Sequence, residues 1–226
     1  MILDLTHPLF FTVPTWDNQQ GFVIETVHSY SECVTTEVNF CVQRFCMNGG
    51  IGTHIDAPVH CFKGAATVDE LPLPCLMVPC VVIDVSDRAH ADYSVSVADI
   101  EQFEMQYGLI PSGSFVIIAT GWDVHWNDRK HYHNNWKFPT LSAEAAQLLV
   151  DRAAVGIGID TLSPDWPESG YPVHRVVLGA GKYIVENVAN ARQLPALGAH
   201  VIILPLRIVG GTESPVRMVA VVHNQK

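Results

Sequence analysis

The alternation of apolar and polar positions predicts a chain that is rich in β-strands. Short, β-branched runs bounded by Gly, Pro or Asp are typical of buried strands. Such runs cover residues 78–85, 114–120, 155–160, 200–208 and 216–222. Between about residues 20 and 48 the alternation is looser, and it indicates the strands of a hairpin. Strands are therefore expected to outnumber helices.

Two segments carry helical spacing instead. Residues 97–107 repeat apolar side chains every three or four positions, and Ser96 precedes them as an N-cap. Residues 143–153 follow Ser142 and carry Glu144 in the first turn, where the helix dipole favours a negative charge. Because no Gly-x-Gly-x-x-Gly follows a strand, the pattern favours a mixed α/β domain with a barrel-like, strongly curved sheet over a dinucleotide-binding sheet.

Composition narrows the class of protein and the partners it can take. The chain has 226 residues without a linker-like segment, which predicts a single domain over residues 1–226. A net charge of −10 argues against nucleic acid or an anionic membrane as partner, because both require clustered Lys and Arg. A small-molecule substrate is expected. The N-terminus shows no secretory signal, and no apolar stretch approaches the ~20 residues of a membrane span, so we expect a cytoplasmic protein.

All six cysteines lie in the first 80 residues, at positions 33, 41, 46, 61, 75 and 80. None forms a Cys-x-x-Cys pair, so neither a zinc knuckle nor a redox motif is indicated. We expect reduced and mostly buried thiols. Cys46 and Cys61 are possible neighbours of a metal site.

Residues 50–60, GIGTHIDAPVH, have the composition of a metal or catalytic site. In an extended chain His54 and Asp56 point to the same face, with α-carbons about 6.6 Å apart. Pro58 turns the chain, so that His60 can return toward the same pocket. Imidazole and carboxylate together suit Zn²⁺ or Mn²⁺. The alternative is that Asp56 caps a turn and both histidines lie on the surface.

Two distant residues are candidates for further ligands. His174 follows Pro172, a typical first-turn residue, in a short helix. Glu186 ends an apolar run, where a buried carboxylate requires a cation or a hydrogen-bond donor. The alternative is that Glu186 only begins a helix over residues 187–191.

These residues resemble the fingerprint His-x-Gly-Thr-His-x-Asp-x-Pro-x-His of the cyclase-like family of metal-dependent hydrolases, which includes bacterial kynurenine formamidase and isatin hydrolase. The matching positions are Gly52, Thr53, His54, Asp56, Pro58 and His60. Further likeness lies at residues 4–6, 14, 16, 119–122, 158–161, 174, 186, 204–206 and 210–211. The resemblance covers nearly the whole chain.

The resemblance implies a swivelling β/β/α domain that forms homodimers or homotetramers. It implies two zinc ions that share Asp56 and Glu186, one of them also bound by His54 and the other by His174. It further implies that His60 donates and accepts protons and that Trp16 lines the substrate pocket.

One departure from the fingerprint matters. Its first histidine falls on position 50, where this chain has Gly50, which offers no ligand atom. We therefore expect a divalent metal, Zn or Mn, with one firmly bound ion per chain favoured over two.

These residues together predict amide hydrolysis. A bound divalent ion lowers the pKa of water to around 7, and a histidine such as His60 can carry the protons. His60 acting only to orient Asp56 is the alternative. A catalytically weak binding protein, suggested by Gly50, and a metal-dependent cyclase or dehydratase are the competing functions.

Other side chains could surround this site. Phe10, Phe11 and Phe62 could form an apolar pocket with Trp16, although we expect about half of these aromatic residues to belong to the core. Asp160, Asp165 and Arg175 are candidates to hydrogen-bond the ligands, with the alternative that Asp160, at the end of a strand, only stabilises the following turn. Residues 122–135 mix histidines with many polar side chains and are expected to form an exposed loop, or a lid over the pocket.

Overall fold

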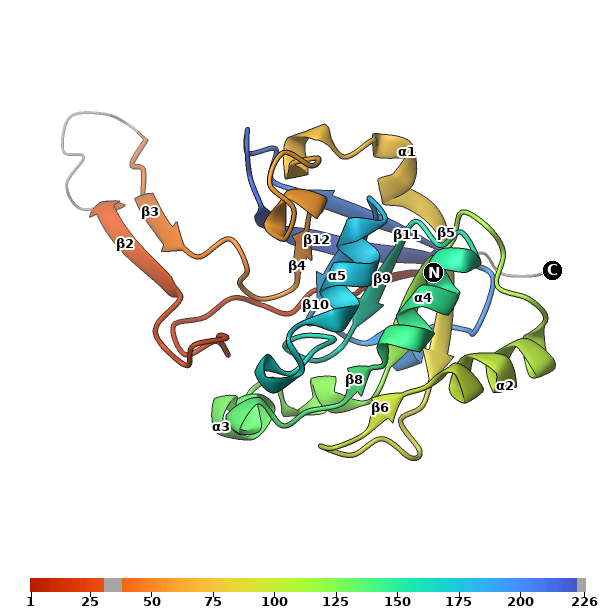
Figure 1. Ribbon diagram of the computed structural model, residues 1–226. Helices are drawn as coiled ribbons and strands as arrows, with labels where there is room; N and C mark the ends of the chain where they lie inside the picture. Colours follow the sequence, from red (N-terminus) through yellow and green to blue (C-terminus); the bar gives the residue numbers. More distant parts are fainter. Residues whose placement is uncertain (31–37, 223–226) are drawn as a thin grey trace.

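The computed structural model describes residues 1–30 and 38–222 (Figure 1). The strands of the main sheet are β1 (Ile2–Asp4), β4 (His54–Asp56), β5 (Met77–Asp84), β7 (Phe115–Ala119), β9 (Gly156–Ile159), β10 (Tyr183–Glu186), β11 (Ala199–Pro205) and β12 (Glu213–Val222). Two smaller sheets pair β2 (Phe22–His28) with β3 (Val42–Met47) and β6 (Ser94–Val95) with β8 (Thr140–Leu141). The helices are α1 (Leu73–Leu76), α2 (Val97–Tyr107), α3 (Arg129–His133), α4 (Ala143–Asp151) and α5 (Pro172–Gly179).

The main sheet closes on itself. Its strands follow the order β12-β11-β5-β7-β9-β10-β4, and β4 then pairs with β12 again. The strands from β5 to β10 run parallel, whereas β4, β11 and β12 join their neighbours antiparallel. The mixed α/β class and the barrel-like, strongly curved sheet that the sequence predicts are therefore confirmed.

Apolar side chains fill the inside of this closed sheet. The rings of Phe115 and Tyr183 stack there with centroids 5.5 Å apart. β9 contributes glycines at this point, because a Cβ at Gly158 would lie 2.9 Å from the Phe115 ring and one at Gly156 would lie 2.7 Å from the Tyr183 carbonyl. Small residues on β9 thus make room for large rings on its neighbours.

The outer face of the parallel strands packs against α2, α4 and α5 in a second apolar cluster. The helix predicted over residues 97–107 coincides with α2, and Ser96 and Asp99 form a capping box at its start. The second predicted helix ends at Asp151 rather than at residue 153. Among the described residues, no helix has the length and apolarity needed to cross a bilayer.

The hairpin predicted between residues 20 and 48 is formed by β2 and β3, which project away from the barrel (Figure 1). Most of its side chains are exposed, including Ile24 and Phe45. Exposure also corrects the expectation of mostly buried thiols, because Cys41, Cys46 and Cys61 are exposed, whereas Cys80 is buried. Cys33 lies outside the described residues.

The prediction of an exposed loop over residues 122–135 is wrong. The segment forms η4 (Trp122–His125), α3 and η5 (Asn134–Trp136). Trp122, Trp126 and Tyr132 are buried in a third apolar cluster. Burial of the large aromatic rings stabilises the segment. Most of the intervening polar side chains stay exposed or half-buried, and the buried His133 has the Trp16 carbonyl 3.0 Å from its Nε2.

Candidate metal centre

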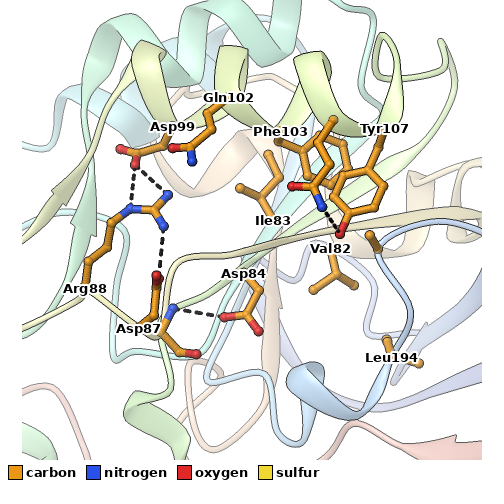
Figure 2. A pocket seen from close by; sticks show the side chains of 13 residues that line it. Val82, Ile83, Asp84, Asp87, Arg88, Asp99, Gln102, Phe103, Tyr107 and Leu194 are labelled. Carbon is orange, nitrogen blue, oxygen red and sulfur yellow. Dashed lines mark hydrogen bonds and ion pairs between the residues drawn. The ribbon is translucent and has the colours of Figure 1, made fainter.

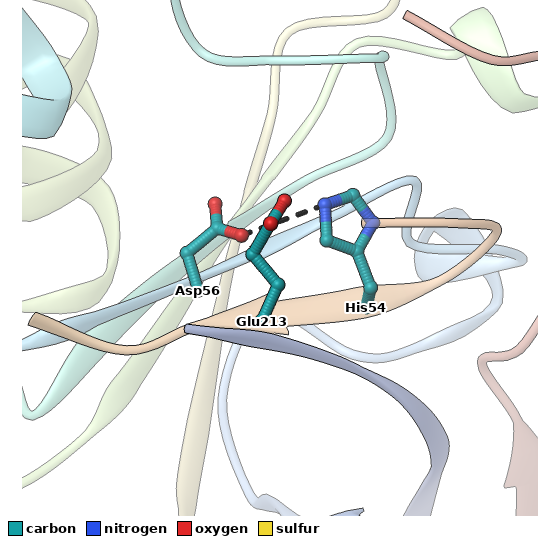
Figure 3. A group of neighbouring side chains, drawn as sticks. All are labelled: His54, Asp56 and Glu213. Carbon is teal, nitrogen blue, oxygen red and sulfur yellow. Dashed lines mark ion pairs between the residues drawn. The ribbon is translucent and has the colours of Figure 1, made fainter. Parts of the chain in front are cut away.

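The central strand of the site is β4, which carries His54 and Asp56 on one face. Its neighbours place acidic residues directly opposite: Glu186 of β10 pairs with His54, and Glu213 of β12 pairs with Asp56 (Figure 3). Cross-strand partners share a face of the sheet, and Ile55 between the two ligands points into the barrel core. Three adjacent strands therefore bring one imidazole and three carboxylates together.

The fifth group comes from α5. Pro172 occupies the first turn, and His174 follows on the side of the helix that faces β4 and β10. Its Nε2 lies 3.7 Å from Asp56 Oδ2 and 3.5 Å from Glu186 Oε1. Its Nδ1 bonds to Asp165 Oδ2 at 2.8 Å. A proton on Nδ1 leaves the Nε2 lone pair free to bind a cation.

His54 is held in the same way. Its Nδ1 donates to the carbonyl of Gly52 at 2.8 Å, and Nε2 faces Asp56 and Glu186 at 3.5 and 3.4 Å. Gly52 has φ of +61°, a left-handed conformation that glycine adopts without strain. The amide of Asn187 also donates to the Gly52 carbonyl at 2.8 Å, which fixes the turn.

These residues form two overlapping donor sets that share Asp56. The first is His54, Asp56 and Glu213, and the second is Asp56, His174 and Glu186; within each, ligand atoms lie within 4.8 Å of one another. Asp56 Oδ1 is buried without a hydrogen-bond partner. The Asp56 carboxylate lies between two imidazoles, with Oδ1 facing Nε2 of His54 and Oδ2 facing Nε2 of His174, and this arrangement fits a divalent cation.

The charges at this site are strongly coupled. Burial lowers the pKa of His54, but Glu186 and Asp56 raise it more, to about 10. Burial likewise lowers the pKa of His174, and Asp165, Asp56 and Glu186 together raise it far above its usual range. Burial raises the pKa of Glu186, and both imidazoles lower it to about 2. The carboxylates thus attract positive charge, and a divalent cation would displace protons from the imidazoles.

His60 lies in the short 3₁₀ helix Pro58–His60, at the edge of a cavity of about 360 Å³ that also contains the five grouped side chains. Its ring centroid is 6.1 Å from that of His174, and its Nδ1 is 3.6 Å from Glu213 Oε2. The turn expected at Pro58 therefore returns His60 to the site. Its role as proton carrier stays a prediction.

Trp16 lines the cavity, and Tyr171 lies 6.1 Å from it between ring centroids. That Trp16 contacts a substrate stays a prediction. Phe10, Phe11 and Phe62 are not among the lining residues, so their predicted place in the pocket is wrong. Phe10 packs against Trp126, and Phe11 is 65% exposed. Cys61 lines the cavity, whereas Cys46 lies on the projecting hairpin.

Of the three residues predicted to hydrogen-bond the metal-binding side chains, the structure places only one in contact with such a side chain. Asp165 supports His174 directly, whereas Arg175 is exposed. Asp160 accepts hydrogen bonds from the backbone of Thr120 and Gly121, and burial raises its pKa to about 7 against those bonds. Asp160 therefore stabilises the turn at residues 120–121 and does not hydrogen-bond a metal-binding side chain.

Sequence reasoning missed Glu213, Asn187 and Tyr171. β12 begins at Glu213, earlier than the start predicted at residue 216, and only its pairing with β4 places this carboxylate beside Asp56. Burial and the Asp56 charge raise the pKa of Glu213. The sequence signal that could have identified Glu213 is an acidic residue at the start of a strand with alternating apolar positions. Asn187, buried with φ of +56°, follows Glu186 directly.

A second cavity of about 430 Å³ lies between β5 and α2 (Figure 2). Its described lining contains no histidine. The Arg88 guanidinium donates to Asp99 at 2.8 Å and to Asp87 at 2.9 Å. Asp84 accepts a hydrogen bond from the backbone N–H of Ser86 at 2.9 Å. Because the acidic groups of this larger cavity already have partners, its described lining lacks the free donor set of the first.

Residues 3–166 match the cyclase family, described as "Putative cyclase", and the chain belongs to this family. It is similar to an isatin hydrolase of Roseibium aggregatum, at 29% identity over 87% of this chain and 80% of the relative. A kynurenine formamidase of Sphingopyxis alaskensis is 28% identical over 96% of both chains.

Solved structures agree with this assignment. The isatin hydrolase A from Labrenzia aggregata, bound to benzyl benzoate, matches with a TM-score of 0.89 and 32% identity over 98% of this chain and 93% of that one. A structure described as a potential metal-dependent hydrolase with cyclase activity matches with a TM-score of 0.79 and 27% identity, over 97% and 96% of the two chains. The predicted resemblance is confirmed.

Proposed function

We propose that this chain is a metal-dependent amidohydrolase that cleaves a C–N bond, other than a peptide bond, in a small aromatic molecule. The substrate would be an arylformamide such as N-formylkynurenine or a cyclic amide such as isatin. The observation that carries the proposal is the position of His60 beside two His/carboxylate donor sets in one cavity. The hydrolase names of the relatives support the same reaction class.

Zn²⁺ or Mn²⁺ suits these donors, since imidazole and carboxylate bind both. We propose that Asp56, His174 and Glu186, all buried, hold a firmly bound ion. His54 and Asp56 belong to the other set, which is less buried and would hold a weaker ion. When bound, such an ion supplies an activated water at neutral pH and polarises the substrate carbonyl.

The protein side chains would position the substrate and move protons. Trp16 and Tyr171 would contact the aromatic ring, because both line a cavity whose volume suits a small ligand. Glu213 Oε2, 3.6 Å from His60 Nδ1, favours a proton on that nitrogen. Nε2 of His60 is then free to accept a proton from water and return it to the departing nitrogen.

Turnover measurements on the metal-reloaded protein test the proposal. The chain is stripped of metal, reloaded with Zn²⁺ or Mn²⁺, and assayed with N-formylkynurenine, isatin and simple aryl formamides. We expect turnover of at least one substrate that disappears with chelator. No turnover of any of them with either metal would contradict the proposal and favour a binding protein.

A substitution separates proton transfer from metal binding. We expect His60→Ala to lower kcat by roughly 10²–10⁴-fold with its metal content unchanged. His90→Ala, at an exposed histidine, is the matched control and should keep normal turnover. Near-normal turnover of His60→Ala with its metal intact would exclude His60 as the proton carrier.

We also propose that the chain forms a homodimer or homotetramer. The projecting β2–β3 hairpin exposes apolar side chains, among them Ile24 at 49% and Phe45 at 57%. Exposed apolar patches of this kind mark protein contacts. Light scattering coupled to gel filtration should give a multiple of the chain mass, and a monomer at micromolar concentration would contradict it.

A further inference from the structure

The position that lacks a family ligand, Gly50, lies directly against Glu213. A Cβ built on Gly50 would collide with Oε1 of Glu213 and would lie 3.3 Å from Nε2 of His54. The backbone at Gly50 does not have the left-handed φ found at Gly52, so glycine is not required there for its conformation. The Glu213 carboxylate therefore fills the space that a side chain at position 50 would enter.

We propose that Glu213 replaces the missing histidine as a metal ligand, and that Gly50 and Glu213 form a compensating pair. This inference rests on the proposed metal-dependent function. Glu213 reaches the site because β12 closes the barrel on β4, opposite Asp56 (Figure 3). Its carboxylate, a His54 nitrogen and an Asp56 oxygen lie within 4.8 Å of one another, as the ligands of one ion must.

The replacement changes the chemistry of the donor set. An imidazole at position 50 would have given this set a second nitrogen beside His54, whereas Glu213 gives it a further carboxylate beside Asp56. Harder oxygen ligands favour Mn²⁺ relative to Zn²⁺. We therefore expect this set to have a stronger preference for Mn²⁺ than a site with the family histidine.

Glu213 has one other neighbour that suggests a different role. Its Oε2 lies 3.6 Å from His60 Nδ1, so it could act only by positioning His60. A positioning role predicts altered turnover with unchanged metal binding. Metal binding itself therefore distinguishes the two roles.

The test is calorimetric titration of the metal-free chain with Mn²⁺, with bound metal counted by mass spectrometry. We expect a strong and a weaker binding step in the unmodified chain, and Glu213→Ala should lose the weaker step or weaken it at least tenfold. Glu25→Ala, at an exposed ion pair with Arg44 on the hairpin, is the control and should keep both steps. Co²⁺ absorption spectra should change in Glu213→Ala and not in the control.

A double variant distinguishes the loss of a metal ligand from misfolding of Glu213→Ala. In Gly50→His/Glu213→Ala the imidazole can enter the vacated space, so we expect the weaker step to return with a shift in preference toward Zn²⁺. Unchanged steps in Glu213→Ala, or a single step in the unmodified chain that Glu213→Ala leaves intact, would overturn the inference and leave the proposed function standing. No binding step in the unmodified chain would instead refute the proposed metal centre.

Discussion

Asp165 offers a direct test of how the firm metal set is held. Its carboxylate accepts three hydrogen bonds: Oδ1 from the backbone N–H of Val173 at 3.1 Å, and Oδ2 from the backbone N–H and Nδ1 of His174 at 3.0 and 2.8 Å. Asp165→Asn keeps the shape but has only one acceptor oxygen. The amide NH₂ must therefore face at least one donor.

Both orientations of the new amide are unfavourable. If NH₂ takes the place of Oδ2, Nδ1 of His174 must give up its proton, and Nε2 then carries it and cannot bind metal. If NH₂ takes the place of Oδ1, the buried N–H of Val173 loses its acceptor, which costs about 1–3 kcal/mol of stability. Substitutions of such supporting residues lower metal affinity by about 10–100-fold, or about 1.4–2.7 kcal/mol.

Competition of Zn²⁺ between the protein and a chelator measures this loss. Asp69→Asn is the matched control, because Asp69 also accepts hydrogen bonds from Thr67 and Gly210 but lies away from the site. It should keep wild-type metal affinity. A folded Asp165→Asn protein that binds Zn²⁺ as tightly as the unmodified chain, and is also as stable to denaturant, would refute this account of His174.

Three further predictions concern stability and substrate binding. Burial lowers the pKa of His7 from 6.5 to about 4, so below pH 6.5 the unfolded chain binds a proton that the folded chain does not. The free energy of unfolding should therefore fall by up to about 3 kcal/mol between pH 6.5 and 4, and an equal slope in His7→Phe would contradict this origin. Trp16→Ala should raise the KM for an aromatic substrate about tenfold with unchanged metal content, and an unchanged KM would exclude contact with the ring. Ile117→Ala, at a fully buried site, should cost about 2–5 kcal/mol in denaturant unfolding, and a loss below about 1 kcal/mol would contradict its place in the core.

Local sequence determined much of the fold and part of the site. The strands and α2 follow from apolar periodicity and capping, which act between residues close in sequence. His54 and Asp56 share a face because side chains alternate along a strand, and Pro172 places His174 in the first turns of α5. The gap at position 50 is also visible in the sequence, as the absence of a side chain.

Tertiary structure alone decided what fills that gap. Glu213 is opposite Asp56 because β12 closes the barrel, and no local pattern records which residues of two distant strands face each other. The burial of Trp122 and Tyr132 likewise depends on a cluster assembled from several segments. Strand register and packing are set by the sum of long-range contacts, so the sequence identifies ligand types whereas the closed sheet determines which of them meet.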